Sequence, residues 1–541
     1  MDCLEKEPLE RELEGRRLLG VSREAIKRIA CLAMAYRLTA DARFLHRAII
    51  ELDAVSAFED WNPSHFLDVA EMATAVGIGY DWLHDALNDD QRTRYREAIL
   101  SKALTVGLDT EAPGNWWIKG TNNWNQVCHG GLTLAALAIA GEGGGDIPSR
   151  IVRQALENIG IGMQVYEPEG AYPEGPGYWD YGTTYNVIFL DVLQSALGSD
   201  FGVTASFPGF LKTARYRAQL NTPAGLSYNF SDNGESRRAS PTLFWFGDSE
   251  VSRLEYDFLA ERAARGLGES DRFLPLDLIW LSRSSLTDVT DDPLPLSSIW
   301  GGKNPVAVFR TSWSDPNAAF LGFKGGAARI SHGQMDAGSF IYEVNGIRWA
   351  VDLGAKSYHH FESQGIQLWD MNQDGERWTL MTWNTLGHSL LRFPGFNPDV
   401  DGRCDWSEPA AHSSTREATA DLTALYPQFY DTYQRMTRLE PDGSAVIEDR
   451  IESLSAPVPP QWNLLTRAQI EPTANGALLR QDGRTLRVEA EAGYPLNVHW
   501  ESAENPPRPE EPTNPGLNRL TIEPQTTKGD LILIVRLTPQ E

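Results

Sequence analysis

Residues 288–305, DVTDDPLPLSSIWGGKNP, mark the point at which the character of the chain changes. This stretch is rich in Pro, Asp, Ser and Gly, a composition typical of linkers and turns. Before it, apolar residues recur at helical spacing, and after it the segments are short and strand-like. We therefore expect a multidomain α and β protein, with a helical domain at residues 1–290 and a β-rich domain at residues 291–541.

The part before residue 288 consists of one helical pattern after another, joined by short polar breaks. Paired helices over such a length favour an α/α toroid over a compact bundle, although the sequence contains no fixed-period repeat. The expected helices cover residues 23–36, 40–50, 65–83, 90–106, 123–140, 148–163, 185–197 and 257–267.

The part after residue 305 contains two hairpin patterns. Asn345-Gly346 lies between two β-rich runs within residues 339–351, and Asn-Gly is the strongest short hairpin signal. Residues 434–451, with the turn PDG at 441–443, form the second pattern, and residues 306–311 and 486–490 are further expected strands. The C-terminal domain is therefore predicted to be an antiparallel β-sandwich.

Composition excludes several classes of function. The 541 residues contain 48 Lys and Arg against 74 Asp and Glu, a net charge of −26, so general binding of nucleic acid is not expected. No apolar run is long enough to span a membrane. The first twenty residues lack the pattern of a signal peptide, and the four cysteines form no CxxC pair or disulfide framework.

Two polar and aromatic clusters stand out in the helical part. Residues 115–131, NWWIKGTNNWNQVCHGG, hold more asparagines than one helix cap requires, beside three tryptophans. Residues 167–185, EPEGAYPEGPGYWDYGTTY, resemble a loop that carries function, although a packed Ω-loop explains them equally well. Aromatic rings beside amides suit sugar binding, because apolar sugar faces stack on such rings.

A third cluster is spread over the β-rich part. It comprises SHGQMDAGSF at residues 331–340, RWAVDLG at 348–354 followed by Tyr358, and NTLGHSLL at 384–391. His, Asp and His from separate strands could form a metal site, or equally a set of hydrogen-bonded polar residues in turns.

These motifs, together with NNWNQVCHGG and YPEGPGYWDY and in this order, resemble those of the heparinase II/III-like polysaccharide lyases. The resemblance extends over nearly the whole chain. It implies an incomplete α/α toroid followed by antiparallel β-sheets, with the active site in the cleft between them. It also implies a carbon–oxygen lyase that cleaves uronic-acid polysaccharides such as hyaluronan, chondroitin sulfate and heparan sulfate by β-elimination.

The resemblance assigns roles to individual residues. Tyr178 matches the tyrosine that acts as general acid and, in syn elimination, also as base. Asn125 matches the residue that holds the substrate carboxylate, and His332 the β-domain histidine that stabilises charge or acts as base. His129 and Tyr358 are further catalytic candidates. The expected substrate-binding residues are Asn123, Trp124, Trp179, Lys119 and Arg238.

Some relatives bind a structural divalent ion, and the matching positions here are Gln334, Asp352 and His388. Gln334 stands where a histidine is expected. A neutral amide oxygen is a poor zinc ligand but suits manganese or calcium. One structural zinc, manganese or calcium ion is therefore expected, and no organic cofactor.

Other functions remain open from the sequence. An alginate lyase of the same fold is one. An α/α-toroid glycoside hydrolase would use paired carboxylates, for which Glu169, Glu174 and Asp180 are available. A non-catalytic sugar-binding protein is the third. The expected partner is an anionic polysaccharide, not nucleic acid or a membrane, and such a substrate implies a periplasmic or secreted protein.

Overall fold

The computed structural model describes residues 2–266, 271–287, 293–407 and 416–540. It contains two compact units, which are described separately. The helical unit comprises Met1–Glu167, Tyr178–Ala214 and Arg238–Asp288, and the β-rich unit comprises Pro168–Gly177, Arg215–Arg237 and Val289–Glu541. Two segments that precede residue 290 thus belong to the β-rich unit, which the sequence did not predict.

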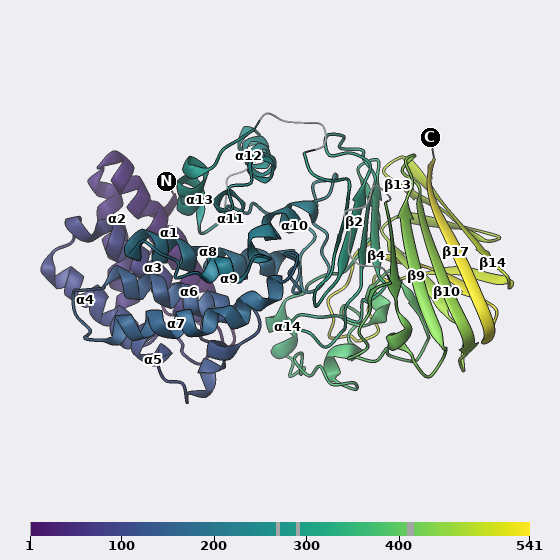
Figure 1. The fold of residues 1–541 in the computed structure, drawn as a ribbon, viewed down its shortest axis with the longest axis horizontal. Helices are drawn as coiled ribbons and strands as arrows, with labels where there is room; N and C mark the ends of the chain where they lie inside the picture. Colours follow the sequence, from purple (N-terminus) through teal and green to yellow (C-terminus); the bar gives the residue numbers. More distant parts are fainter. Residues whose placement is uncertain (1, 267–270, 288–292, 408–415, 541) are drawn as a thin grey trace. The chain divides into compact units, whose positions relative to one another are not determined.

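The helical unit is a succession of helices of different lengths (Figure 1). Helices α1 and α3, α3 and α6, and α6 and α7 pack against each other. The longer helices are α1 (Leu19–Thr39), α2 (Ala42–Ser56), α3 (Leu67–Leu83), α4 (Asp89–Ile99), α6 (Asn123–Ala138), α7 (Ile147–Met163), α8 (Pro176–Leu197), α12 (Ser249–Ala264) and α13 (Leu274–Arg283). The shorter ones are α5 (Thr105–Gly107), α9 (Val203–Ser206) and α11 (Thr242–Trp245). Helix α10 (Thr213–Gln219) begins in the helical unit and continues into the β-rich unit.

Helix α6 packs closely on two neighbours because its sequence places two glycines side by side. A Cβ at Gly131 would lie 2.5 Å from the Ala70 carbonyl oxygen of α3. A Cβ at Gly130 would lie 2.4 Å from the Tyr185 carbonyl oxygen of α8. The glycine pair of the HGG motif therefore allows α3, α6 and α8 to approach at backbone distance.

Helix α8 begins earlier than the sequence predicts. We expected a loop up to residue 185, but the helix starts at Pro176, where a proline suits the first turn. Gly175 precedes it with φ of 84°, a conformation that favours glycine. As a result Tyr178, Tyr181 and Tyr185 lie on the helix at spacings of three and four residues and share one face.

The described residues of the β-rich unit form three antiparallel sheets. The first has the order β1-β2-β3-β4-β5: β1 (Ser297–Trp300), β2 (Val306–Arg310), β3 (Phe320–Lys324), β4 (Phe340–Val344) and β5 (Ile347–Ala350). The third has the order β15-β16-β11-β6: β15 (Leu496–Ser502), β16 (Asn518–Pro524), β11 (Gln461–Thr466) and β6 (Leu391–Arg392).

The second and largest sheet has eight strands, and β9, β10 and β17 run side by side within it (Figure 1). Its order is β12 (Gln469–Thr473), β13 (Gly476–Gln481), β14 (Arg484–Ala492), β17 (Lys528–Gln540), β10 (Ala445–Ser455), β9 (Thr432–Leu439), β8 (Glu417–Asp421) and β7 (Asp405–Trp406). Side chains from all three sheets, among them Phe323, Trp462 and Val535, share one hydrophobic core.

The expected hairpins are present. β4 and β5 pair around Asn345 and Gly346, whose φ values of 57° and 74° are those of a tight hairpin turn. β9 and β10 pair around the turn at residues 441–443. The expected linker differs: its residues 288–292 lie outside the described part of the chain, and its second half forms the strand β1.

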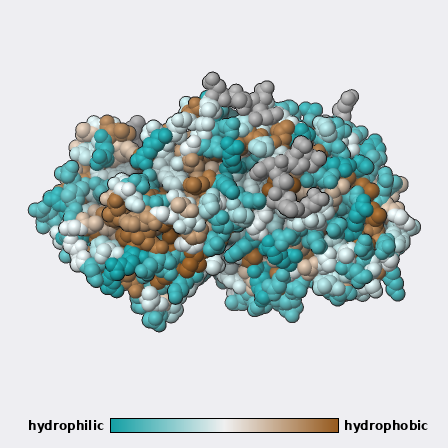
Figure 2. All heavy atoms as spheres, in the orientation of Figure 1, coloured by the Kyte–Doolittle hydropathy of each residue, from teal (hydrophilic) through white to brown (hydrophobic). Residues whose placement is uncertain are grey.

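Hydrophilic and hydrophobic residues are mixed on the face shown in Figure 2. Within the described residues, no helix combines the length and the apolar character needed to cross a membrane.

Candidate functional site

The asparagine-rich motif of the helical unit forms the start of α6. Asn122 is its N-cap, because its side-chain oxygen accepts a hydrogen bond from the backbone N–H of Trp124 at 3.1 Å. Asn123, the first helical residue, is 1% exposed. One asparagine of the motif therefore serves helix capping, and the others have separate positions.

Asn125 is fully buried, and backbone carbonyls already engage its amide. Its Nδ2 donates to the carbonyl oxygens of Ile118 at 3.0 Å, Trp117 at 3.3 Å and Asn158 at 3.3 Å. These bonds tie α6 to the segment before it and to α7. The contacts give Asn125 a structural role, and its predicted role as a carboxylate ligand stays a prediction.

His129 lies one turn further along α6 and is 1% exposed. Its Nε2 is 3.2 Å from the Ile118 carbonyl oxygen, and its ring packs edge-on against Trp117. Burial lowers the pKa of His129 to about 4, against only a small opposing effect of the carbonyl. The ring is therefore neutral at pH 7, with its proton on Nε2, and it contributes to packing.

The predicted sugar-stacking residues differ in exposure. Trp179 is fully buried and its Nε1 donates to Thr213 Oγ1 at 2.7 Å, so it is a core residue and its prediction as a stacking surface was wrong. Trp124 is partly buried against Trp116, with ring centroids 4.9 Å apart. Trp116 is 50% exposed and offers the aromatic face that Trp179 lacks.

The remaining predicted residues of the helical unit are accessible to solvent to different degrees. Tyr178 is partly exposed in the first turn of α8, and Lys119 and Arg238 are exposed. Exposed cations can attract an anionic chain, although each interaction is weak in water. Their roles stay predictions.

A buried charged cluster anchors α8 behind Tyr178. Tyr185 of α8 donates its hydroxyl to Glu71 Oε2 at 2.9 Å, and Arg23 and Arg272 form ion pairs with the same carboxylate. Burial opposes ionisation of Glu71, but the two guanidinium groups outweigh it and lower the pKa of that carboxyl. The cluster fixes the face of the helix on which Tyr178 also lies.

The β-rich unit brings His332 and Tyr358 together, as the sequence expects of cleft residues. The His332 Nδ1 lies 3.1 Å from the Tyr358 hydroxyl, and their rings are nearly parallel. His332 has a φ of 58°, which is unusual for a residue other than glycine. Such backbone strain persists only where the surroundings enforce it, and it clusters at functional sites.

Asp232 lies at the centre of this group, and the sequence did not reveal it. Its Oδ2 accepts hydrogen bonds from the Tyr358 hydroxyl at 2.7 Å and faces His332 Nδ1 at 3.2 Å. Residues 231–236, SDNGES, resemble an exposed turn, and only the φ of 59° at Ser231 marks it as a constrained one. The signal for Asp232 is tertiary, because its partners are about 100 or more residues away in the chain.

Three further donors hold the same carboxylate. Its Oδ1 accepts from Trp383 Nε1 at 2.6 Å and Gln334 Nε2 at 2.9 Å, and Arg377 donates to both oxygens at 3.0 and 3.1 Å. Burial would raise the pKa of Asp232, but the charge of Arg377 and the hydrogen bonds keep it well below its usual range. Asp232 is therefore an ionised carboxylate that only accepts hydrogen bonds.

An exposed tryptophan lies against this cluster. Trp369 is 42% exposed, and its ring centroid lies 5.0 Å from that of Tyr358 and 5.5 Å from that of His332. Its Nε1 donates to Glu362 Oε1 at 3.1 Å, which fixes the indole plane. A fixed, accessible indole beside polar groups suits the stacking of a sugar ring. No motif in the sequence singles out Trp369.

Two of the three predicted metal ligands contact each other, and the third contacts Asp232. The Asp352 Oδ2 and the His388 Nδ1 are hydrogen-bonded to each other at 2.8 Å. The Gln334 amide nitrogen instead donates to Asp232 Oδ1 and to the Gly354 carbonyl. Within the described residues, no three His, Cys, Asp or Glu side chains lie together as metal ligands would. The Gln334 Oε1 and the His388 Nε2 are buried without a hydrogen-bond partner among the described residues, so a divalent ion held by these residues stays a prediction, and no step below depends on it.

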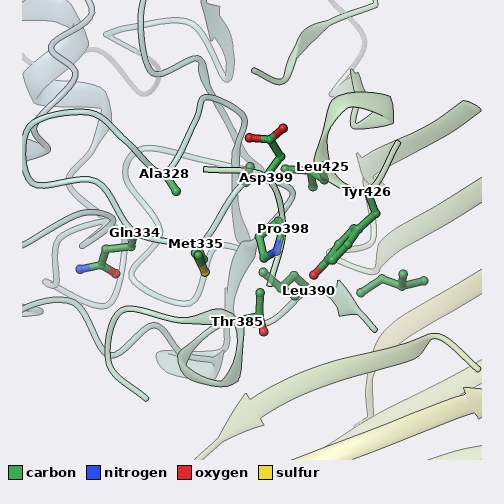
Figure 3. A pocket seen from close by; sticks show the side chains of 11 residues that line it. Ala328, Gln334, Met335, Thr385, Leu390, Pro398, Asp399, Leu425 and Tyr426 are labelled. Atoms are coloured by element: carbon green, nitrogen blue, oxygen red, sulfur yellow. The ribbon is translucent and has the colours of Figure 1, made fainter. Parts of the chain in front are cut away.

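A small cavity lies beside Gln334 in the β-rich unit. Figure 3 shows the Gln334 amide pointing away from Pro398, Leu425 and Tyr426, which line the other side. The cavity has a volume of about 10 Å³, enough for about one water molecule. It is too small for a sugar and belongs to the packing of the β-rich unit.

Two solved structures share the fold of this chain. A crystal structure of heparinase III matches over 99% of this chain and 79% of its own, with a TM-score of 0.67 and 12% identity. A mutant of heparan sulfate lyase HepC from Pedobacter heparinus matches over 99% and 78%, with a TM-score of 0.59 and 12% identity. The chain thus has the fold of these polysaccharide lyases, and the predicted toroid followed by antiparallel β-sheets is confirmed.

The family model narrows the class. Residues 307–526, less than half of the chain, match the family described as Heparinase II/III-like, C-terminal. The resemblance that the motifs indicate is confirmed by this match together with the fold. A comparison with curated protein sequences gives no match.

Proposed function

We propose that this protein cleaves uronic-acid-containing polysaccharides by β-elimination, with glycosaminoglycans as the preferred substrates. Alginate is the alternative substrate on the same fold. The observation that carries the proposal is the group of His332, Tyr358 and Asp232 beside the accessible indole of Trp369, in a chain with the fold of heparinase III.

The reaction makes clear demands on the site. A base removes the proton at C5 of the uronate, the electrons of that C–H bond form the C4–C5 double bond, and the C4–O bond to the leaving sugar breaks. The leaving oxygen then takes a proton from an acid. The substrate carboxylate must be neutralised or hydrogen-bonded, because negative charge builds up beside it.

We assign Tyr178 as the acid that donates a proton to the leaving oxygen, as the motif resemblance indicates. Tyr178 is partly exposed and lies on a helix that the Glu71 cluster anchors, which supports this assignment. His332 is assigned to proton removal or charge stabilisation at C5, with Tyr358 as its neighbour. Trp369 is assigned to sugar stacking.

The test is the ultraviolet absorbance of the unsaturated uronate that elimination produces. The protein is mixed separately with hyaluronan, chondroitin sulfate, heparan sulfate and alginate. We expect a rise with at least one polymer, and its loss in Tyr178→Phe. The matched control is Tyr181→Phe, a buried tyrosine one turn along α8, which should retain activity.

Other outcomes would overturn the proposal. New reducing ends without absorbance would indicate hydrolysis by paired carboxylates instead. Neither signal on any polymer would leave a sugar-binding protein. A matched pair of variants, Asn123→Ala and Asn125→Ala, identifies which asparagine holds the carboxylate: the one whose loss raises KM and lowers kcat without lowering Tm.

The proposed substrate has consequences for partners and location. The partner would be an anionic polysaccharide, which a chain with a net charge of −26 must bind through local cations. Such polymers occur outside the cytoplasm, so we propose a periplasmic or secreted protein. Fractionation of the producing cells tests this point.

A further inference from the structure

The carboxylate of Asp232 determines where hydrogen atoms lie in the cluster around it. Arg377 forms an ion pair with both oxygens of Asp232, so this carboxylate only accepts, and every polar group that contacts it must donate. The Tyr358 hydroxyl is 2.7 Å from Asp232 Oδ2 and has one hydrogen, which is therefore directed at Asp232. The Tyr358 oxygen consequently presents only lone pairs to its other neighbour, His332.

The same reasoning applies to His332. Its Nδ1 lies 3.2 Å from Asp232 Oδ2 and 3.1 Å from the Tyr358 oxygen, and both of these are acceptors. Nδ1 must therefore carry a hydrogen. In the neutral imidazole the other nitrogen, Nε2, is then the basic one. Nε2 faces away from Asp232, and on that side a carboxylate oxygen, Glu174 Oε2, lies 3.9 Å from it.

We propose that Asp232 is a positioning residue that holds His332 in the Nδ1–H tautomer, so that Nε2 is the nitrogen that accepts a proton. The arrangement has the same logic as the carboxylate that orients the histidine of a serine-protease triad. Its catalytic consequence rests on the proposed elimination reaction, whereas the tautomer itself does not.

The remaining contacts of Asp232 make a sharp variant possible. Trp383 and Gln334 donate to Oδ1, and Arg377 donates to both oxygens. In Asp232→Asn the amide oxygen would remain on the Oδ1 side, where these donors meet. The amide nitrogen would then take the place of Oδ2 and donate to His332 Nδ1. The substitution is therefore expected to move the His332 proton from Nδ1 to Nε2.

The experiment is a two-bond ¹H–¹⁵N correlation spectrum of the full-length protein with ¹⁵N-labelled histidine, recorded at pH 8. The ten histidines are manageable, and the signals of His332 are those that disappear in His332→Gln. We expect Nδ1 protonated and Nε2 bare in the native protein, and the reverse in Asp232→Asn. With an active polymer, kcat of that variant should fall by at least about 10²-fold with little change in KM.

Two further variants distinguish a change of tautomer from a general loss of structure. If Asp232→Asn fails to fold because Arg377 is left without its counter-charge, the double variant Asp232→Asn/Arg377→Gln removes that charge and keeps the amide. Trp383→Phe removes a donor from Oδ1 and leaves Oδ2 in place. Trp383→Phe should therefore preserve the tautomer of His332. If the cluster had only a structural role, losing either contact would disturb His332 alike.

The outcomes are distinct. Nε2–H or a doubly protonated ring in the native protein, or an unchanged tautomer in both Asn variants, would overturn the proposal. A shift of the tautomer in Trp383→Phe as large as in Asp232→Asn would also overturn it. Correct tautomers without cleavage of any polymer would refute the proposed function and leave this inference standing.

Discussion

The ion pair between Lys324 and Asp336 allows a quantitative test of how the His332 loop is held. Lys324 ends strand β3, and its Nζ lies 2.5 Å from Asp336 Oδ1, with both side chains fully buried. Asp336 belongs to residues 331–338, the loop that carries His332. Lys324→Met leaves a buried carboxylate without its cation, and we expect a clear loss of stability.

The magnitude follows from the burial. Removing one partner of a buried pair costs about 3–5 kcal/mol, and at about 2 °C per kcal/mol for a domain of this size the melting temperature should fall by about 6–10 °C. Replacing both partners, in Lys324→Met/Asp336→Leu, should recover most of this loss, because two apolar side chains need no counter-charge.

Differential scanning calorimetry measures these shifts. The matched control is Arg329→Met, which breaks the exposed pair with Asp401, where the side chains are 46% and 58% exposed. It should change stability by no more than about 1 kcal/mol. A shift below about 2 °C in Lys324→Met, or a double variant as unstable as the single one, would refute the reasoning.

Three further predictions concern pH, binding and the anchoring of α8. The pKa of His129 is lowered to about 4, so as the pH falls the unfolded state takes up the His129 proton before the folded state does. The free energy of unfolding should therefore fall by about 3 kcal/mol between pH 6.5 and 4. Urea unfolding at several pH values measures this, and in His129→Gln the free energy of unfolding should depend less on pH. Trp369→Ala should raise KM about tenfold or more with a smaller change in kcat, since stacking of a ring on an aromatic side chain contributes about 1–3 kcal/mol in nucleic-acid complexes. Steady-state kinetics on the active polymer measure both constants, and a fall in kcat alone would contradict the prediction. Glu71→Gln should destabilise the protein by about 3 kcal/mol or more, and it should lower kcat because Tyr178 is then less firmly held. An unchanged kcat in the folded variant would show that the Glu71 cluster does not position Tyr178.

The main architecture was predictable from the sequence because it depends on local patterns. Helical periodicity and strand alternation identify elements whose apolar faces must be buried. The turns at Asn345-Gly346 and at residues 441–443 are equally local, since they depend on residues that tolerate positive φ. The start of α8 was missed because a Gly-Pro-Gly segment resembles a loop, although Pro176 in a first turn favours a helix.

The candidate site was predictable only in part. His332 and Tyr358 were found through motifs and do lie together. Trp179 was misjudged, because an indole in an aromatic segment gives no sign of whether it faces solvent or the core. Asp232 and Trp369 were missed, since their significance lies in partners from distant segments.

Buried charges hold the loop that carries His332. His332 and Gln334 both contact Asp232, and Asp336 is paired with Lys324. The polar side chains at these three positions are thus each tied to another segment by a charged group.

Protein charges thus connect this loop to several other segments. This bracing also explains how His332 keeps a φ of 58°, a strain of about 1–2 kcal/mol that isolated loops would relieve. Asp232 enters the β-rich unit from residues 215–237, a segment far before the sheets in the chain. The loop and this early segment therefore depend on each other, and we expect the β-rich domain expressed from residue 291 onward, which lacks Asp232, to leave Arg377 without its counter-charge and to fold poorly.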